Sequence, residues 1–284
     1  MKNLFSVNAY TDDDGLLPEL KATEIRTVSD ATAQSMDDSI DALQEINKKI
    51  FLPMLLLIIK YALFAIGIIL LSVSVSSCAE TGINDRIKIC VGIASVLLVA
   101  SAIIFIVEKI REKRVVESDE YKYAISKSEN ADRNSLLELN IPSSAPAVDV
   151  FMWLYKIKKD GSFKNAISTE YDPMEMYVFE EKGYLCLADL SSVYGIAPIS
   201  SFKKIEYITK KSSFSCWNKD EPYNKGKYKE YKISSDKYET EFYIKNLCSV
   251  QLELNGEEYE IIVPPYDIYA FENILGLKAE YPVE

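Results

Sequence analysis

Two apolar stretches decide the architecture: FLPMLLLIIKYALFAIGIILLSVSVSS at residues 51–77 and ICVGIASVLLVASAIIFIV at 89–107. The hydrocarbon core of a bilayer is about 30 Å thick, and a helix needs roughly 20 apolar residues to cross it. The two runs have that length and lie close together in the chain. We therefore expect a two-helix transmembrane hairpin at 51–77 and 89–107, joined by an external loop at 78–88.

Lys60 is the one charged residue inside the first run. A lysine in hydrocarbon is costly, but its long side chain can carry the ammonium back to the headgroup region. One interpretation is such a snorkelling lysine, and the other is a residue of an ion or substrate pathway. The first is favoured, because the second run at 89–107 offers no carboxylate as a partner.

Basic residues next to the two runs predict the orientation, since Lys and Arg stay on the cytoplasmic side. The loop between the runs carries only Arg86 and Lys88. We expect both termini in the cytoplasm of a cell, with these topology anchors beside the membrane: Lys48, Lys49, Lys109, Arg111, Lys113 and Arg114.

Composition limits the functional classes. The 284 residues leave room for one soluble domain beside the hairpin. A net charge of −11 argues against nucleic-acid binding, which needs a basic face. The chain has no histidine, which excludes Ser-His-Asp and Cys-His catalysis and every metal site that needs imidazole. We expect no cofactor and no metal, although an enzyme built from carboxylates, lysine or tyrosine stays open.

The five cysteines form no C-x-x-C pair, so they predict no metal site. Cys186, Cys216 and Cys248 fall in the expected cytoplasmic domain and should be free thiols. Cys78 and Cys90 bracket the expected external loop. A disulfide between them and two free thiols are both open.

The segments beside the hairpin predict a helical stalk. Residues 1–28 read as a flexible acidic tail, and the adjacent carboxylates at 12–14 lack the ligand spacing of a calcium loop. An apolar stripe predicts an amphipathic helix at 29–50, and a second helix is expected at 108–125. These two helices either pack antiparallel in one chain or form a coiled coil between subunits. A polar, proline-containing linker is expected at 126–147.

Residues 148–284 predict an α+β domain. After a short helix at 149–157, alternating apolar and polar residues indicate hairpin-linked strands closed by a helix from Asp267 to Gly276. Turns are expected at 180–183 and at Asn255-Gly256. The result is a strongly bent sheet or open barrel capped by the C-terminal helix. Strands are expected at 174–179, 184–188, 192–196, 202–208, 213–217, 228–233, 240–244, 250–254 and 258–263.

The strand sequences YLCLAD, VYGIAPISSFKKI and YEIIVPPY, followed by a C-terminal helix, resemble a bacterial PH-like domain over about residues 172–280. Such domains occur fused to membrane hairpins in bacterial proteins. The resemblance implies a bent β-sandwich capped by the helix and carries no catalytic residues. It also implies a bacterial cell membrane as the location. The loop at 180–183 is net acidic, unlike the basic loop of phosphoinositide-binding members.

Two kinds of side chain are candidates for a binding surface. The lysines Lys203, Lys204, Lys210 and Lys211 suggest either contact with anionic lipid or a solvated strand edge that deters edge pairing. Tyrosines form either a binding surface or half-buried packing. The tyrosines concerned are Tyr223, Tyr228, Tyr231, Tyr238, Tyr243, Tyr259, Tyr266 and Tyr269.

The function predicted from the sequence is a membrane-anchored, non-enzymatic interaction protein that presents its C-terminal domain to a protein partner in the cytoplasm. One alternative is a lipid-headgroup or membrane-surface sensor, and the other is an enzyme with an unrecognised carboxylate or tyrosine site. An exposed apolar groove or sheet edge would favour a protein partner. A contiguous basic face would favour the lipid sensor, and a deep pocket with convergent polar groups would favour the enzyme.

Overall fold

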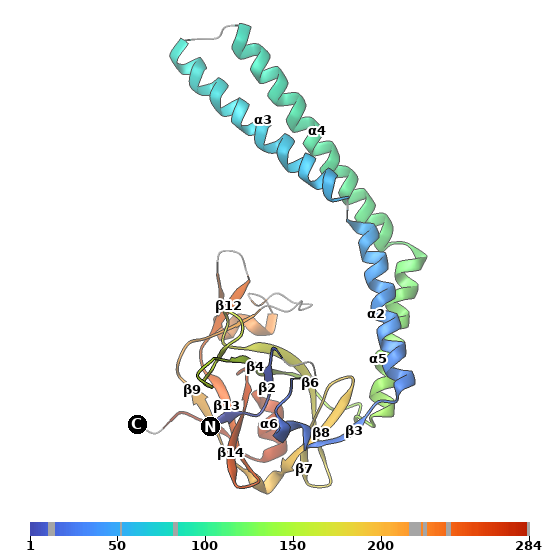
Figure 1. Cartoon of the computed structure of the whole chain (residues 1–284), viewed down its shortest axis with the longest axis vertical. Helices are drawn as coiled ribbons and strands as arrows, with labels where there is room; N and C mark the ends of the chain where they lie inside the picture. The colour runs from blue at the N-terminus through green and yellow to red at the C-terminus, as the bar shows by residue number, and fades with distance from the viewer. Residues whose placement is uncertain are drawn as a thin grey trace. The chain divides into compact units, whose positions relative to one another are not determined.

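The computed structural model describes residues 1–10, 15–51, 53–81, 85–215, 223, 226–236 and 240–282. The chain divides into two compact units (Figure 1). The helical unit is Asp30–Arg133, and the sheet unit combines Met1–Ser29 with Asn134–Glu284. The carboxylates at 12–14, for which the sequence predicts no calcium loop, lie outside the described residues.

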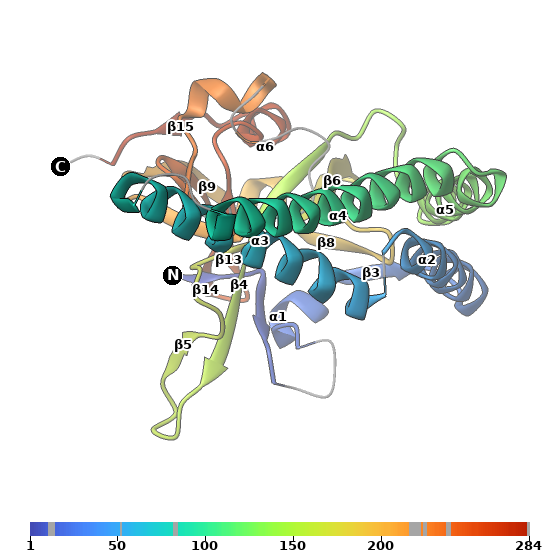
Figure 2. The ribbon, with the colours of Figure 1, turned by 90° about the horizontal axis from the view of Figure 1, so that it is seen from above.

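Two long helices, α3 (Met54–Thr81) and α4 (Asp85–Val116), lie side by side in the helical unit (Figures 1 and 2). Both are long and apolar enough to cross a membrane. In the most apolar 18-residue stretch of each helix, only 11% is buried. The hairpin of apolar helices is therefore confirmed. The expected loop at 78–88 is too long, because both helices continue into polar residues at that end. Asp85 in the first turn of α4 favours this extension through the helix dipole.

The stalk consists of α2 (Asp30–Ile50) and α5 (Asp119–Glu138). Lys49 Nζ lies 2.6 Å from Glu120 Oε2, and Lys127 Nζ lies 3.3 Å from the Asp38 carbonyl oxygen, so the two helices run antiparallel. The amphipathic helix at 29–50 is confirmed. The helix expected at 108–125 is instead the end of α4 followed by α5.

The change of helix occurs at Ser118, whose Oγ accepts a hydrogen bond from the Tyr121 backbone N–H at 3.2 Å and so caps the start of α5. The expected linker at 126–147 is wrong in its first half, because α5 continues to Glu138. The capping serine and the helix that follows it are local features that a composition-based boundary overlooks.

The sheet unit contains a large mixed sheet, a small antiparallel sheet and helix α6. The large sheet has the order β15-β9-β13-β14-β4-β6-β7-β8-β3, and the small one has the order β10-β12-β11. The strands are β1 (Lys2–Asn3), β2 (Ser6–Asn8), β3 (Glu24–Thr27), β4 (Ala147–Ile157), β5 (Phe163–Asn165), β6 (Asp172–Glu181), β7 (Tyr184–Ala188), β8 (Ser192–Pro198), β9 (Phe202–Ile208), β10 (Ser212–Ser215), β11 (Ser234–Ser235), β12 (Glu241–Ile244), β13 (Leu247–Leu254), β14 (Glu257–Val263) and β15 (Ala279–Glu280). The short helices are α1 (Pro18–Lys21), the 3-10 turns η1 (Ile199–Ser201) and η2 (Gly226–Tyr231), and α6 (Ile268–Leu275).

The N-terminal segment is part of the sheet unit, so the expected flexible tail at 1–28 is wrong over its described residues. β1 pairs parallel with β14, β2 pairs parallel with β4, and β3 pairs antiparallel with β8. Leu4, Phe5 and Leu20 are 0–1% exposed in the main core. Acidic composition does not prevent order here, because a few large apolar side chains are buried by strands from far along the chain.

Residues 149–157 form strand β4 and not the expected short helix. β4 pairs with β6 along one side and with β14 on the other, and Val150 and Phe151 are fully buried. A short apolar run fits both periodicities, and aromatic and β-branched residues favour the strand. The strand expected at 228–233 is also wrong, since the 3-10 turn η2 extends through Tyr231 and β11 begins only at Ser234.

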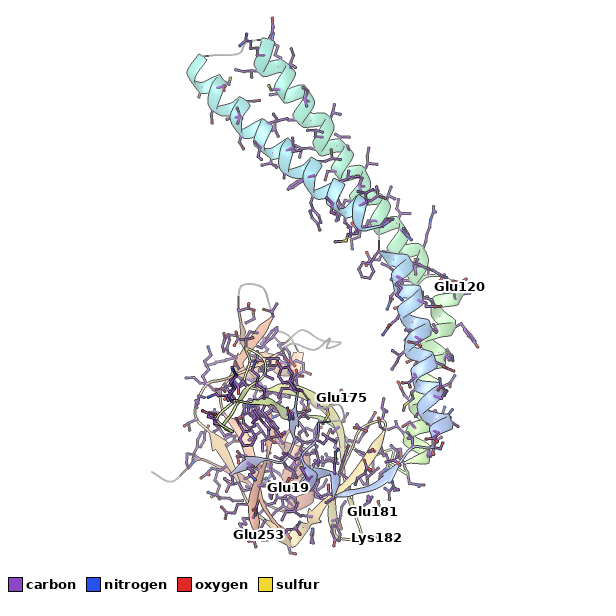
Figure 3. The ribbon with its side chains drawn as sticks, viewed as in Figure 1. Glu19, Glu120, Glu175, Glu181, Lys182 and Glu253 are labelled. Atoms are coloured by element: carbon purple, nitrogen blue, oxygen red, sulfur yellow. The ribbon has the colours of Figure 1, made fainter. Side chains whose placement is uncertain are left out.

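The two expected hairpins are confirmed. At the β6–β7 turn, Lys182 and Gly183 have φ of 53° and 81°, and at the β13–β14 turn, Asn255 and Gly256 have φ of 54° and 82°. Two consecutive left-handed residues match the twist of paired strands, and glycine adopts that conformation without a steric penalty. Figure 3 labels Glu181 and Lys182 at the β6–β7 turn.

Helix α6 covers the main core. Ile268, Phe271 and Leu275 are buried against the sheet, and the helix ends at Gly276 with φ of 65°, as the sequence predicts. A second, aromatic cluster that includes Phe151, Phe214 and Tyr266 lies under the small sheet. The α+β character and the capping helix are therefore confirmed, with a sheet that recruits both ends of the chain.

Candidate functional site

The candidate site of the sheet unit is an open groove of about 570 Å³, here called the tyrosine groove. It lies where β9, β12 and the segments after β12 and β15 come together. Its walls are Tyr207, Lys211, Glu230, Tyr231, Lys232, Ser234, Tyr243, Ile244, Lys245, Asn246, Pro265 and Tyr281.

Aromatic rings form the walls of the tyrosine groove. The rings of Tyr207, on β9, and Tyr281, just after β15, are 4.7 Å apart with an interplanar angle of 33°. Tyr231 packs against the buried Tyr266 with ring centroids 5.8 Å apart. Burial raises the pKa of Tyr207, and a hydrogen bond with Glu241 is the main cause that raises the pKa of Tyr243. These phenols are therefore protonated at neutral pH.

The groove is also basic. Lys211, Lys232 and Lys245 line it together with one carboxylate, Glu230. Lys211 Nζ lies 4.5 Å from the centroid of the Tyr243 ring, a cation–π contact. Among the described residues, Lys232 and Lys245 form no ion pair. In a chain of net charge −11, this groove has an excess of positive charge and suits an acidic ligand.

The backbone of the groove is held in an uncommon conformation at two places. Lys232 and Asn246 have φ of 51° and 61°, in the left-handed region that residues with a Cβ rarely adopt. Asn tolerates this region because its short side chain can form local hydrogen bonds, whereas the Lys side chain provides no such compensation. Such positions concentrate at binding sites, where the surrounding fold holds them.

The tyrosines that the sequence singles out differ in location and burial. Tyr231 and Tyr243 line the tyrosine groove, and Tyr269 is 50% exposed on α6. Tyr207 and Tyr281 also line the groove but are not predicted, because only β15 pairing on β9 brings them together. Tyr238 lies outside the described residues. The buried tyrosines, for which the packing interpretation is confirmed, are Tyr223, Tyr228, Tyr259 and Tyr266.

The four lysines that the sequence suggests either for contact with anionic lipid or for a solvated strand edge have local partners. Lys203 Nζ lies 3.1 Å from Glu253 and 3.0 Å from Glu258, and its hydrogen bond with Glu258 is the main cause that raises its pKa.

The other lysines of this set are arranged similarly. Lys204 pairs with Glu206 at 3.0 Å, and Lys210 pairs with Glu170. Lys211 belongs to the tyrosine groove. Carboxylates thus accompany three of the four lysines, and the set does not form a uniformly basic face.

The predicted topology anchors gather at one end of the hairpin. Lys109 pairs with Glu112 at 2.6 Å, Lys113 pairs with Glu117 at 3.7 Å, and Lys48 is exposed. The remaining three anchors line a second groove of about 550 Å³, here called the stalk groove. Its walls are Lys49, Val107, Ile110, Arg111, Arg114, Val115, Ser118 and Glu120.

A buried acid–tyrosine cluster bears on the enzyme alternative. Tyr266 Oη donates to Asp149 Oδ2 at 2.9 Å, and the Asp149 backbone N–H donates to Asp267 Oδ2 at 2.8 Å. The two aspartates are 2% exposed and Tyr266 is 5% exposed, which leaves no room for a substrate beside them. These bonds hold β4 against the start of α6.

The cysteines are free thiols at the four described positions. Cys78 and Cys90 are partly exposed and form no disulfide, while Cys186 and Cys248 are buried. Burial raises the pKa of the Cys248 thiol to about 12, so it is an inert packing group. Cys216 lies outside the described residues.

Neither site contains a group of histidine, cysteine, aspartate or glutamate side chains that would hold a metal ion, within the part of the chain that is described. Both grooves offer aromatic or basic side chains for non-covalent binding. Comparison of the chain with protein-family models, with curated proteins and with solved structures gives no match.

Proposed function

We propose that this chain is a membrane-anchored, non-enzymatic interaction protein. Helices α3 and α4 cross the membrane of a bacterial cell as a hairpin with both termini in the cytoplasm. The sheet unit, which we propose to be a PH-like domain, binds an acidic segment of a partner protein in the tyrosine groove. Anchoring raises the local concentration of such a domain, so that weak contacts become effective.

The observation that carries the proposal is the exposure of the apolar side chains on α3 and α4. Leu55, Ile69 and Val96 are 68%, 60% and 68% exposed. A water-soluble protein rarely exposes a contiguous apolar surface of this extent, because hydration of that surface is unfavourable. Lipid supplies the apolar surroundings that the rest of the helical unit does not.

The tyrosine groove supports a protein partner. Tyrosine is enriched at protein interfaces, since its ring provides a large contact area and its hydroxyl a hydrogen bond. Lys211, Lys232 and Lys245 add charge complementarity to aspartate or glutamate side chains. A groove of about 570 Å³ accommodates a few residues of extended chain and not a large flat interface.

A photo-crosslinking experiment in cells tests this function. A photoreactive amino acid replaces Tyr243 in the full-length protein, and adducts are compared with those from the same amino acid at Tyr184, which is 45% exposed on β7. We expect a discrete adduct from position 243 and none from 184. Adding Lys232→Glu and Lys245→Glu should abolish it, because the groove becomes acidic.

A matched variant controls for charge. Lys204→Glu/Lys278→Glu makes the same charge change at lysines that pair with Glu206 and Glu272 and do not line the groove. The adduct should persist in this variant. Equal adducts from positions 243 and 184, or equal loss in both charge variants, would reject the tyrosine groove as the binding site.

A further inference from the structure

The stalk groove joins features from three helices of the helical unit. Lys49 comes from the last turn of α2, Arg111 and Arg114 from α4, and Glu120 from the first turn of α5. Arg111 and Arg114 are three residues apart and therefore lie on one face of α4. Figure 3 labels Glu120 at the start of α5.

The charges of this groove are unevenly compensated. Lys49 Nζ lies 2.6 Å from Glu120 Oε2, so these two charges satisfy each other. Arg111, which is half-buried, and Arg114 form no ion pair with any described residue. The groove therefore presents two uncompensated guanidinium groups side by side. The planar fork of a guanidinium matches the oxygens of a phosphate.

Apolar side chains lie next to these guanidiniums. Val107 closes the apolar run of α4, and Ile110 and Val115 continue the lining. Val107 and Ile110 are 50% and 47% exposed. A cavity with two cations at one place and exposed aliphatic surface beside them is complementary to an amphiphile that has an anionic head and a hydrocarbon body.

We propose that the stalk groove binds one anionic diacyl phospholipid. Its phosphate accepts hydrogen bonds from Arg111 and Arg114, and its glycerol and upper acyl chains contact Val107 and Ile110. This inference rests on the proposed membrane insertion of α3 and α4. It assigns lipid recognition to the helical unit and not to Lys203, Lys204 and Lys210, whose charges are compensated by carboxylates.

Native mass spectrometry of the full-length protein in detergent tests the assignment. The protein is titrated with phosphatidylglycerol and, separately, with phosphatidylcholine. We expect one phosphatidylglycerol to bind with about tenfold preference over phosphatidylcholine, since each cation near an anionic lipid headgroup increases the binding constant a few-fold. In Arg111→Gln/Arg114→Gln the preference should fall to about twofold or less.

Lys109→Gln/Lys113→Gln is the matched control. It also removes two positive charges from α4, but at lysines that pair with Glu112 and Glu117 and do not line the groove. Its preference for phosphatidylglycerol should stay within about twofold of the unmodified protein. A second variant, Arg111→Lys/Arg114→Lys, keeps the charge but loses the guanidinium fork, and an intermediate preference is expected.

Three results would overturn the proposal. They are an absence of lipid preference in the unmodified protein, an equal loss in the lysine control, and displacement of the lipid by equimolar glycerol phosphate, which would make the groove a site for free phosphate. Alkaline carbonate extraction of membranes separates this inference from the proposed function. Release of the chain rejects both, whereas retention without lipid preference rejects the lipid site alone.

Discussion

Lys60 Nζ on α3 lies 2.7 Å from Glu108 Oε2 on α4, and their side chains are only 9% and 22% exposed. Ser101 Oγ donates to the Lys60 backbone carbonyl at 3.1 Å, and the ammonium lies 4.6 Å from the centroid of the Tyr61 ring. The interpretation of Lys60 as a lysine without a carboxylate partner is therefore wrong, although the run at 89–107 itself contains no carboxylate. Glu108 is the first residue beyond the apolar run, and α4 continues through it without interruption.

This ion pair is expected to hold the register of the hairpin. Glu108→Ala leaves the Lys60 ammonium without its counter-charge in apolar surroundings, and should lower the unfolding midpoint of the detergent-solubilised protein by several degrees. Replacing both residues by leucine should restore most of the loss, because two apolar side chains need no partner. Lys109→Ala, which breaks an exposed pair, should have little effect. Additive effects of the two leucine substitutions would contradict this role.

Thiol labelling is expected to report the orientation of the hairpin. Cys78, near the end of α3, and Cys90, near the start of α4, are both partly exposed at the tip. A membrane-impermeant maleimide applied to intact cells should label the unmodified protein. Cys78→Ser/Cys90→Ser should stay unlabelled in intact cells and become labelled only after lysis in denaturant, which exposes the buried Cys186 and Cys248. Labelling of this double variant in intact cells would contradict a cytoplasmic sheet unit.

Acid should weaken the attachment of β3 to the sheet. Arg26 on β3 donates to both carboxylate oxygens of Glu181 at 3.0 and 2.7 Å, and this bond is the main cause that lowers the pKa of Glu181. Its folded pKa thus lies below the unfolded value of about 4.3. The stabilisation is present above that pH and is lost as the pH falls through the folded pKa. Denaturant unfolding between about pH 6 and pH 3 measures it.

Glu181→Gln provides the comparison for the acid effect. Its stability at neutral pH should be lower, and the difference from the unmodified protein should shrink toward acid pH. A difference in stability that is constant with pH would show that the Arg26–Glu181 pair does not account for the loss of stability in acid.

Phe5 is expected to be as important as any residue of the C-terminal domain. Phe5→Ala removes a fully buried ring that packs edge-on against Tyr194 at 6.5 Å, and should reduce the free energy of unfolding of the sheet unit by about 3–4 kcal/mol. Tyr10→Ala, on the same segment but 68% exposed, should cost less than about 1 kcal/mol. Urea unfolding of the full-length protein measures both. Equally small losses of stability in both variants would contradict the packing of residues 1–10 in the core of the sheet unit.

Tyr266→Phe tests the buried polar cluster as a structural element. It deletes the hydrogen bond to Asp149 and leaves a buried carboxylate with one fewer donor, which should cost about 1–2 kcal/mol. Tyr269→Phe, on the exposed face of α6, serves as the control and should change stability little. Urea unfolding distinguishes the two. No loss in Tyr266→Phe would contradict a role in holding β4 to α6.

Features encoded by neighbouring residues could be predicted from the sequence. The apolar runs at 51–77 and 89–107 determine two long helices by length and hydrophobicity alone. Asn255-Gly256 determines a tight turn, because both residues accept positive φ. Gly276 ends α6 for the same reason. The helix at 149–157 was predicted wrongly, since a short apolar run does not distinguish a strand from a helix.

Only the tertiary structure decided which distant residues meet. Lys60 finds Glu108 through the antiparallel packing of α3 and α4, and Tyr207 meets Tyr281 because β15 pairs parallel with β9. The N-terminal strands join β4, β8 and β14 across more than a hundred residues. Local propensity carries no information about such pairs. They are selected by the burial of side chains such as Phe5 and by hydrogen bonding of strand edges that would otherwise face water.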